Sequence, residues 1–349
     1  MRIAQVAPLF ESVPPKYYGG TERVVSYLTE ELVRQGHEVT LFASGDSVTK
    51  AHLVAGCRRA LRLDKHCIDQ MAHHVLMLEH IVQRAREFDV LHFHVDYMHY
   101  PLSRRQFTPY LTTLHGRLDI PDLEPLYREF RDAPVVSISN SQRLPLPAAN
   151  WLGTVYHGLP DDLYQYREKP GAYLAFIGRI SPEKRVDRAV AIARQVRMPL
   201  KIAAKVDDVD RDYFETFIKP LLDDPLIEYI GEIGEGEKDE FLGCAIALLF
   251  PIDWEEPFGL VMIEALACGT PVVAFRRGSV PEVLVDGRTG FIVEDLAGAV
   301  DAVRRIGEID RADCRQAFEE RFTVQRMTEA YVDLYQRLVN GEMDKAGAA

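Results

Sequence analysis

Two glutamates in the second half of the chain, Glu256 and Glu264, have the residue type and spacing to recognise hydroxyl groups. Glu256 precedes Pro257 and Gly259, so we expect it in a loop at the entrance of a helix. Glu264 falls inside the apolar run Leu260–Ala267, where burying an unpaired carboxylate would be costly. An ionised carboxylate accepts several hydrogen bonds, so sugar or ribose hydroxyls would be suitable partners. A salt bridge or a helix cap is the structural alternative.

Two basic residues, Arg179 and Lys184, follow an apolar strand candidate in the segment Gly178–Arg185. Within this segment Ser181 is a suitable helix N-cap, and Pro182 suits the first helical position. The two cations would then lie at a strand end beside a helix N-terminus, where a diphosphate finds positive charge and a favourable dipole. The alternative is a solvated cluster of charges.

The pair Gly19 and Gly20, followed by Thr21 and Glu22, stands at the start of the first long helix. Glycines allow a ligand to approach the backbone closely, and a helix N-terminus offers N–H groups to an anion. The distance from the first strand is too long for a dinucleotide-binding fingerprint. A tight turn before a helix capped by Thr21 explains the motif equally well.

Short apolar runs rich in β-branched residues alternate with amphipathic segments, which predicts parallel sheets with helical crossovers. The expected strands are Arg2–Ala7, Glu38–Ala43, Asp89–His94, Tyr110–Leu114, Val135–Ile138, Thr154–Tyr156, Tyr173–Ile177, Leu200–Ala204, Ile227–Ile230, Ala245–Phe250 and Pro271–Ala274. The expected helices include one that ends at Gly36, then Gln70–Glu87, Lys184–Val196, Leu260–Ala267, Ala297–Ile306, Arg311–Glu320 and Val324–Val339. The segments Tyr213–Leu222 and Lys238–Leu242 extend the alternation in the second half.

The domain organisation follows from length and from one polar stretch. The 349 residues exceed the roughly 250–300 at which a single core stops growing. The stretch Asp161–Ala172 carries Pro and Gly and is the best linker candidate. We therefore expect an α/β protein with two Rossmann-like domains, residues 1–165 and residues 166–323. The end of the chain, Gly341–Ala349, is expected to fray.

Composition excludes several classes of protein. The net charge of -12 argues against a nucleic-acid partner, which would require a basic footprint. The 5 cysteines form no CxxC pair and suit the reduced thiols of a cytoplasmic protein. No apolar run is long enough to span a membrane, and a small basic cluster near Arg58 and Lys65 allows at most peripheral membrane contact. Composition does not indicate an oligomeric state.

No metal site is expected. We see no motif for a divalent metal: Asp208-Val209-Asp210 has the DxD spacing, but it follows Asp207 in a polar stretch that fits the entrance of a helix. A glycosidase also uses two carboxylates, about 5–9.5 Å apart. Eight residues of helix between Glu256 and Glu264 would span about 12 Å, which disfavours a glycosidase. The loop at Pro257 can alter this distance.

Several motifs together resemble family-4 glycosyltransferases. They are the Gly19–Glu22 loop, the Gly178–Arg185 segment, the Glu256/Glu264 arrangement, and the downstream runs Gly269–Ala274 and Gly278–Glu282 with Asp286–Phe291. The combination, in this order and spacing, is far more specific than any single motif. The resemblance covers nearly the whole chain and is strongest over residues 174–293.

The resemblance implies a GT-B fold, with two domains facing across a cleft, and retaining transfer from a nucleoside diphosphate sugar to a hydroxyl acceptor. It implies no cofactor and no metal. It also implies that the acceptor attacks from the face that the diphosphate leaves, and that the leaving phosphate helps to deprotonate the acceptor. No protein nucleophile is assigned. The last helix, about residues 324–340, is expected to pack back onto the first domain.

The resemblance also assigns roles to residues. Arg179 and Lys184 would hold the diphosphate, Glu264 the ribose hydroxyls, and Glu256 the donor sugar. The backbone near the sugar would come from Phe258, Gly259 and Leu260, and that near the β-phosphate from Gly19 and Gly20.

His115 follows a first-half strand and matches a family position near the sugar and the acceptor. Arg179, Lys184, Glu256 and His115 are thus the expected catalytic residues. The region 94–107, including His94 and Asp96, matches no subfamily signature, and we expect it to shape the acceptor site together with His115.

The donor and the acceptor stay open. UDP-glucose is the first candidate donor, followed by GDP-mannose and UDP-N-acetylglucosamine. A nucleotide-sugar 2-epimerase shares the architecture, and a non-catalytic nucleotide-sugar-binding module is the alternative from another class. The acceptor can be a small molecule, a lipid carrier or a growing glycan.

Overall fold

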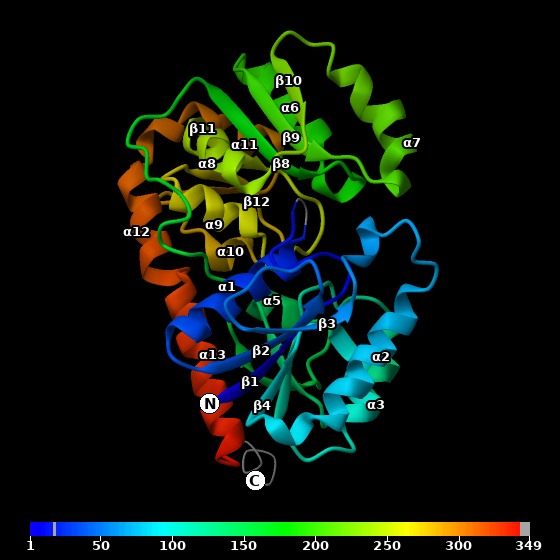
Figure 1. Cartoon of the computed structure of the whole chain (residues 1–349). Coiled ribbons are helices and arrows are strands. Elements are labelled where there is room, and N and C mark those ends of the chain that lie inside the picture. The colour runs from blue at the N-terminus through cyan, green and yellow to red at the C-terminus, as the bar shows by residue number, and fades with distance from the viewer. Residues whose placement is uncertain (17–18, 343–349) are drawn as a thin grey trace. The chain divides into compact units, whose positions relative to one another are not determined.

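The computed structural model describes residues 1–16 and 19–342, and the chain in it forms two compact units (Figure 1). The first unit is Met1–Gly158 together with the C-terminal segment that begins at Val324, and the second is Leu159–Thr323. Most of the tail that was expected to fray, Gly341–Ala349, lies outside the described residues.

The first unit is built on a parallel sheet of seven strands within its described residues, in the order β3-β2-β1-β4-β5-β6-β7. The central strands are buried on both faces, which explains their continuous apolar runs. The strands are β1 Arg2–Val6, β2 Glu38–Ser44, β3 His52–Cys57, β4 Val90–Phe93, β5 Tyr110–Thr113, β6 Pro134–Ser137 and β7 Asn150–Thr154.

Helices flank this sheet, and the last helix of the chain is one of them. They are α1 Gly20–Arg34, α2 Gln70–Gln83, α3 Tyr100–Ser103, α4 Leu123–Glu129, α5 Asn140–Arg143 and α13 Val324–Val339. Helix α13 contacts α1 and strand β4, so the chain returns to its first unit after completing the second (Figure 1). Its buried residues recur at helical spacing, including Met327, Tyr331 and Tyr335.

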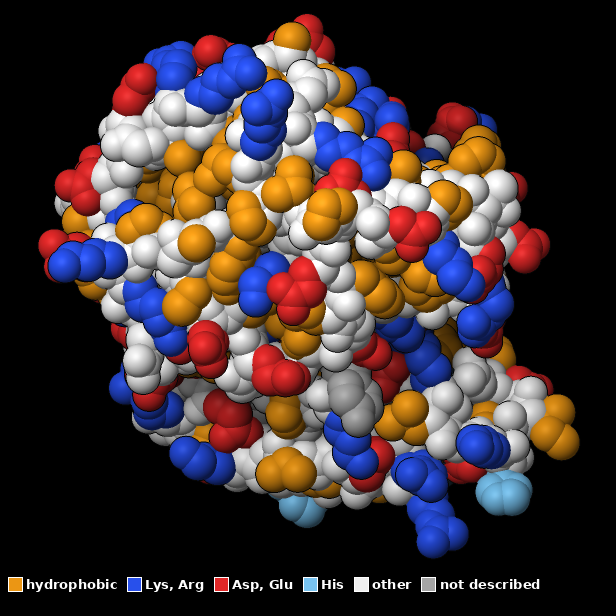
Figure 2. Space-filling view, turned by 90° about the horizontal axis from the view of Figure 1, so that it is seen from above, with side chains coloured by type: hydrophobic (Ala, Val, Ile, Leu, Met, Phe, Trp, Pro, Cys, Tyr) orange, Lys and Arg blue, Asp and Glu red, His pale blue; other side chains and the backbone are white. Residues whose placement is uncertain are grey.

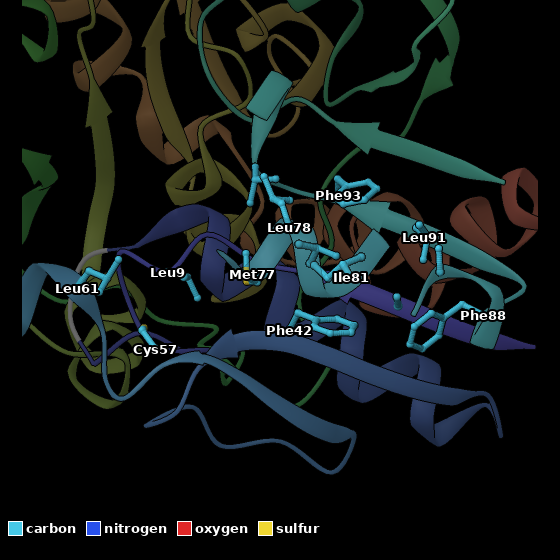
Figure 3. Packing of buried hydrophobic residues seen from close by; sticks show 14 residues of the cluster. Leu9, Phe42, Cys57, Leu61, Met77, Leu78, Ile81, Phe88, Leu91 and Phe93 are labelled. Atoms are coloured by element: carbon cyan, nitrogen blue, oxygen red, sulfur yellow. The ribbon is translucent and has the colours of Figure 1, made fainter. Parts of the chain in front are cut away.

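The apolar side chains of α2 pack against the sheet and form a core. Met77 and Ile81 point from α2 toward the apolar side chains of the sheet, and Phe42 lies edge-on to Phe88 with ring centroids 5.9 Å apart (Figure 3). These side chains are nearly inaccessible to water. Burying a large apolar side chain stabilises a fold by roughly 1.5–3 kcal/mol, so this cluster holds β1, β2 and β4 in place.

The second unit repeats the plan with six strands among its residues, in the order β10-β9-β8-β11-β12-β13. Its strands are β8 Tyr173–Arg179, β9 Leu200–Lys205, β10 Ile227–Gly231, β11 Ala245–Phe250, β12 Val272–Phe275 and β13 Gly290–Val293. Its helices are α6 Val186–Val196, α7 Arg211–Tyr213, α8 Glu235–Gly243, α9 Leu260–Ala267, α10 Val280–Val283, α11 Leu296–Arg304 and α12 Arg311–Arg321. Two parallel α/β sheets confirm the predicted fold class.

The structure differs from the expected elements at three strands. Strands β3 and β13 were not expected, and β7 ends at Thr154, where the predicted strand began. Strand β3 pairs only with β2 at the sheet edge and is mostly half-buried, so its sequence lacks a strong apolar run. Strand β13 has only four residues, and its first residue is a glycine.

The segment Asp161–Ala172 is a fixed part of the second unit and not a linker. Arg167 forms an ion pair with Asp239 at 2.6 Å, and the Arg315 guanidinium donates to the carbonyl of Asp161. The chain passes between the units at Gly158 and at Val324, so the boundary lies before the predicted residues 165 and 166.

Charged side chains of both signs are interspersed over the face that Figure 2 shows, with hydrophobic side chains among them. That face therefore presents no broad field of one sign. None of the helices within residues 1–16 and 19–342 has the length and apolarity to cross a membrane.

Candidate active site

The candidate residues of the second unit follow two neighbouring strands at its topological switch point. Strand β8 pairs with β9 on one side and with β11 on the other, so the strand order reverses between β8 and β11. Arg179 ends β8, and Glu256 lies in the loop that follows β11. Ligands of open α/β sheets bind beyond the carboxyl ends of strands at such a point.

The loop after β8 differs from the expected helix start. Pro182 opens a single 3₁₀ turn that ends at Lys184, and Ser181 makes no capping hydrogen bond with its side chain. Arg185 has a left-handed backbone (φ 54°), and α6 begins only at Val186. A non-glycine residue in this conformation is strained and persists where its surroundings hold it, often at functional sites. Here Arg185 is held by ion pairs with aspartates, at 2.8 and 3.0 Å.

Arg179 is surrounded by carboxylates. Its guanidinium donates to Glu183 at 2.7 Å, and it lies 3.6 Å from Asp207 and 3.9 Å from Asp210. Burial raises the pKa of Asp210 above its ordinary value, and the nearby Arg179 opposes that shift. A diphosphate bound here would compete with these carboxylates for the guanidinium.

Lys184 and Glu256 form a close pair, although 72 positions separate them in the sequence. The Lys184 ammonium donates to Glu256 Oε2 at 2.5 Å, and the Trp254 indole donates to the same oxygen at 3.1 Å. The ammonium also lies 4.9 Å from the centre of the Trp254 ring. Glu256 is 9% exposed, so the pair is largely withdrawn from water. The two residues assigned to diphosphate and sugar therefore meet at one point.

The Glu256 loop is held from behind by the turn after β12. The Ser279 backbone N–H donates to the Glu256 carbonyl at 2.9 Å, and the Ser279 hydroxyl donates to the Phe258 carbonyl at 2.7 Å. A Cβ added to Gly278 would lie 2.3 Å from the Glu256 carbonyl oxygen and 2.4 Å from its nitrogen. Gly278 is therefore required for this approach, and its backbone is also left-handed (φ 52°).

We expect Gly278→Ala to lower kcat/KM by at least tenfold, because the added methyl group must push the Glu256 backbone away from Lys184. Misplacing a catalytic group by about 1 Å can cost on the order of 100-fold. The matched control is Gly287→Ala, since Gly287 has a similar backbone (φ 74°) but nothing near its missing Cβ. Steady-state kinetics of both variants at equal thermal stability would check this. An equal loss in the two variants would contradict the positioning role of Gly278.

Glu264 lies on α9 and is paired with Lys238 on α8. The Lys238 ammonium donates to Glu264 Oε1 at 2.8 Å and lies 3.6 Å from Glu235. Glu264 is 3% exposed. Sequence reasoning expected a partner for this carboxylate but did not find Lys238. A lysine in the first turn of a helix otherwise rich in acidic residues was the available signal.

Helix α9 begins at Leu260, with Gly259 as its N-cap in the left-handed conformation (φ 80°). A Cβ on Gly259 would lie 2.9 Å from the Met262 methyl group, so a glycine is needed here as well. Phe258 is 2% exposed and packs edge-on against Phe322. The Met262 N–H donates to the Gly259 carbonyl at 3.0 Å, whereas the N–H groups of Leu260 and Val261 have no carbonyl partner within the helix. Such N–H groups at a helix start can bind an anion or an oxygen ligand.

The glycine pair of the first unit begins α1, but its details differ from expectation. Helix α1 starts at Gly20 with Gly19 as the N-cap, so Thr21 lies inside the first turn and does not cap it. A Cβ on Gly19 would lie 2.8 Å from Pro15, which explains this glycine by packing. Gly20 is exposed. Burial raises the pKa of Glu22, the acidic residue of the same turn.

His94 and His115 lie at the carboxyl ends of the paired strands β4 and β5 and contact each other. His94 Nδ1 is 2.9 Å from His115 Nε2. Burial lowers the pKa of His94 and of His115, so both imidazoles are neutral. Asp96, two residues further along, is exposed and has a left-handed backbone (φ 49°). Such strain just beyond a strand end is a signal of function.

The structure thus brings the predicted residues together in groups within each unit. Lys184 and Glu256 form one pair in the second unit, and His94 and His115 form another in the first. Functional contacts that the sequence did not reveal are those of Lys238, Trp254 and the Gly278-Ser279 turn.

Comparisons with known proteins agree with this architecture. The family model described as Glycosyltransferase Family 4 matches residues 18–207, and the model described as Glycosyl transferases group 1 matches residues 165–320. The structure of HepE from Anabaena in complex with UDP and glucose aligns with a TM-score of 0.73 over 96% of this chain and 99% of that one, at 17% sequence identity. That likeness supports the GT-B fold.

Two curated relatives show how far the sequence similarity extends. D-inositol 3-phosphate glycosyltransferase 2 of Catenulispora acidiphila is 29% identical over 206 residues, covering 52% of this chain and 48% of that protein. The chain therefore spans about half the length of this relative. N-acetyl-alpha-D-glucosaminyl L-malate synthase of Bacillus anthracis is 25% identical over 374 residues, covering 93% of this chain and 97% of that protein. Because one family model alone covers more than half of the chain, this chain belongs to glycosyltransferase family 4.

Proposed function

We propose that this protein is a retaining glycosyltransferase that moves a hexose from a nucleoside diphosphate sugar to a hydroxyl acceptor without a metal ion. The Lys184–Glu256 pair carries the proposal. It places a cation from the loop after β8 beside a hydrogen-bond acceptor from the loop after β11, shortly before the start of α9. A glycosyl diphosphate needs this combination, because its phosphates are anionic and its sugar hydroxyls are hydrogen-bond donors.

In this proposal the cations stabilise the leaving group. Departure of the nucleoside diphosphate builds negative charge on its β-phosphate. Lys184, Arg179 and the first N–H groups of α9 would stabilise that charge as fixed donors, each contributing roughly 2–4 kcal/mol to the transition state. In this proposal no protein nucleophile acts. The acceptor hydroxyl attacks from the face that the diphosphate leaves and gives its proton to the departing phosphate.

The two glutamates then serve recognition. Glu256 would accept hydrogen bonds from the sugar and Glu264 from the ribose. Each carboxylate forms an ion pair with a lysine, Glu256 with Lys184 at 2.5 Å and Glu264 with Lys238 at 2.8 Å.

UDP-glucose is the first donor that we propose, and the Anabaena neighbour whose structure contains UDP and glucose supports it. UDP-N-acetylglucosamine is the second, because the N-acetyl-alpha-D-glucosaminyl L-malate synthase of Bacillus anthracis matches 93% of this chain. GDP-mannose stays the third candidate. The alternatives from other classes are a 2-epimerase-like enzyme and a non-catalytic binding module. Analysis of the reaction products distinguishes both of them from a transferase.

The test is a panel of nucleotide sugars, first for thermal stabilisation of the protein and then for transfer to a set of hydroxyl acceptors. We expect one donor to raise the Tm, because a ligand that binds only the folded state stabilises it by mass action. We expect transfer to continue in EDTA, and NMR of the product to show the anomeric configuration of the donor.

Each part of the proposal can fail separately. Donor binding without hydrolysis or transfer would indicate a binding module, and a C2-epimerised nucleotide sugar would indicate an epimerase. Loss of activity in EDTA that Mg²⁺ restores would refute metal independence. An inverted product would refute retention.

A further inference from the structure

A continuous hydrogen-bonded network runs through the first unit from helix α13 to His115. Tyr335 on α13 lies 3.0 Å from Gln5 Nε2, and Gln5 Oε1 lies 2.9 Å from His94 Nε2. His94 Nδ1 then lies 2.9 Å from His115 Nε2. Gln5, His94 and Tyr335 are each at most 2% exposed. Buried polar groups of this kind must satisfy one another, so the direction of each hydrogen bond is constrained.

The direction can be followed from Gln5. Its amide nitrogen can only donate, so it donates to the Tyr335 hydroxyl, and its amide oxygen must accept from His94 Nε2–H. A neutral imidazole carries one N–H, so His94 Nδ1 is an acceptor. The partner at that acceptor is His115, whose Nε2 must therefore carry its proton.

The other branch of the network agrees with this assignment. The Tyr335 hydroxyl, having accepted from Gln5, donates to His92 Nδ1 at 2.7 Å. His92 Nε2–H then donates to the Thr113 hydroxyl at 2.7 Å, and Thr113 is 2.9 Å from the hydroxyl of Tyr331. Each ring nitrogen thus has one role, and the Gln5 amide nitrogen also lies 3.5 Å from His92 Nδ1, which is an acceptor in this assignment. Burial lowers the pKa of His92 well below 6.5, in agreement with a neutral ring.

We propose that His94, Gln5 and Tyr335 are positioning residues that keep the His115 proton on Nε2, so that His115 presents the lone pair of Nδ1 to a substrate hydroxyl. Nδ1 of His115 forms no hydrogen bond with any residue in the described part of the chain, and His115 is half-buried at the end of β5. The role in substrate binding rests on the proposed transferase function. The tautomer itself does not depend on it.

The chemical consequence is a requirement on the ligand. An unprotonated Nδ1 accepts a hydrogen bond and repels a carbonyl or carboxylate oxygen. The group opposite His115 must therefore be a hydroxyl or another N–H or O–H donor. In this arrangement His115 acts as a neutral acceptor and not as an imidazolium that neutralises phosphate charge.

The direct test is side-chain NMR of the protein with ¹⁵N-labelled histidine, using His115→Gln to assign the His115 signals. We expect the wild type to show a protonated Nε2 and an unprotonated Nδ1 on His115. A proton on Nδ1 would overturn the proposal. This measurement needs no substrate, so absence of transfer with every donor would count against the proposed function and leave the tautomer result standing.

Kinetics test whether His94 acts through His115. We expect His94→Leu to lower kcat by about tenfold, with the KM for the donor changed by less than about threefold. On a His115→Ala background the same substitution should cost nothing more, because its route of action is already removed. A further tenfold loss on that background would overturn the proposal. His94→Asn, whose amide oxygen replaces Nδ1 as the acceptor, should restore much of the loss even if His94→Leu folds poorly.

The two tyrosines of α13 supply a matched pair. Tyr335→Phe removes the hydroxyl that orients Gln5, whereas Tyr331→Phe removes one that lies beyond Thr113 and outside the route to His115. Both lose one buried hydroxyl. We expect only Tyr335→Phe to change the His115 nitrogen signals and to lower kcat. Equal effects of the two substitutions would show a merely structural role.

Discussion

Lys184→Ala is expected to lower kcat/KM by about 100-fold. The substitution removes a cation that would stabilise the leaving diphosphate, and a single lost donor of this type typically costs 10²–10³ in rate. It also leaves Glu256 buried without its ammonium partner, which is 2.5 Å away in the wild type. Both effects act on the transition state, so kcat should fall more than donor affinity.

The control for this prediction is Lys201→Ala. Lys201 is a second-unit lysine in a more exposed ion pair with Glu228, at 3.3 Å, and such pairs contribute little. Its kinetics should match the wild type. Unchanged kinetics of Lys184→Ala would remove Lys184 from the site. Arg179→Ala, measured beside it, should lose at least tenfold if the guanidinium leaves Glu183 to bind phosphate.

Glu256→Gln separates the two roles at the same point. The amide keeps the shape of the side chain but is a weaker acceptor for sugar hydroxyls, and it loses the attraction to Lys184. We expect turnover to fall while UDP affinity, measured by calorimetry, changes little. Lost UDP binding with normal turnover at saturation would show that Glu256 serves the nucleotide and not the sugar.

Lys238→Met is expected to lower the free energy of unfolding by about 3–5 kcal/mol, because it leaves the buried Glu264 carboxylate without its cation. The side chains of Lys238 and Glu264 are 15% and 4% exposed, so water screens this pair poorly. Denaturant unfolding followed by circular dichroism would measure the loss. A change below 1 kcal/mol would show that the pair behaves like a surface salt bridge.

The double variant Lys238→Met with Glu264→Leu distinguishes stability from binding. Replacing both members of a buried pair by apolar residues is often neutral, so most of the lost stability should return. Nucleotide affinity should stay low, because the acceptor for ribose hydroxyls is gone. Restored affinity in the double variant would refute the ribose assignment of Glu264. Lys201→Met, in a more exposed pair, should cost less than about 1 kcal/mol.

Local patterns were sufficient to predict most of the fold. Helix α13 has the predicted bounds, Val324–Val339, because its apolar residues recur at helical spacing. Helix α1 ends near Gly36, whose left-handed backbone (φ 85°) only glycine adopts easily. The pattern was insufficient at one edge of each sheet, where β3 and β13 lie.

Residue types and their order along the chain were also sufficient to indicate the family. The carboxylates at Glu256 and Glu264 and the cations at Arg179 and Lys184 were identified because their chemistry and their positions after strands are local properties. The start of α6 was placed too early, because Pro182 suits a 3₁₀ turn as well as a helix and nothing local showed that Arg185 would be left-handed.

The sequence by itself therefore determined the α/β class, the position of most elements and the residues that bear charge near strand ends. Only the tertiary structure decided which of these residues meet. Lys184 reaches Glu256, and Lys238 reaches Glu264, because neighbouring strands and helices far apart in the chain lie side by side in the second unit. The route from Tyr335 to His115 exists because α13 returns to β1 and β4, which brings Tyr335 to Gln5 and His92 across 330 and 243 positions of the sequence. Periodicity and capping act within a few residues, whereas the partners of buried charges are set by which strands and helices become neighbours in the fold, which no local pattern encodes.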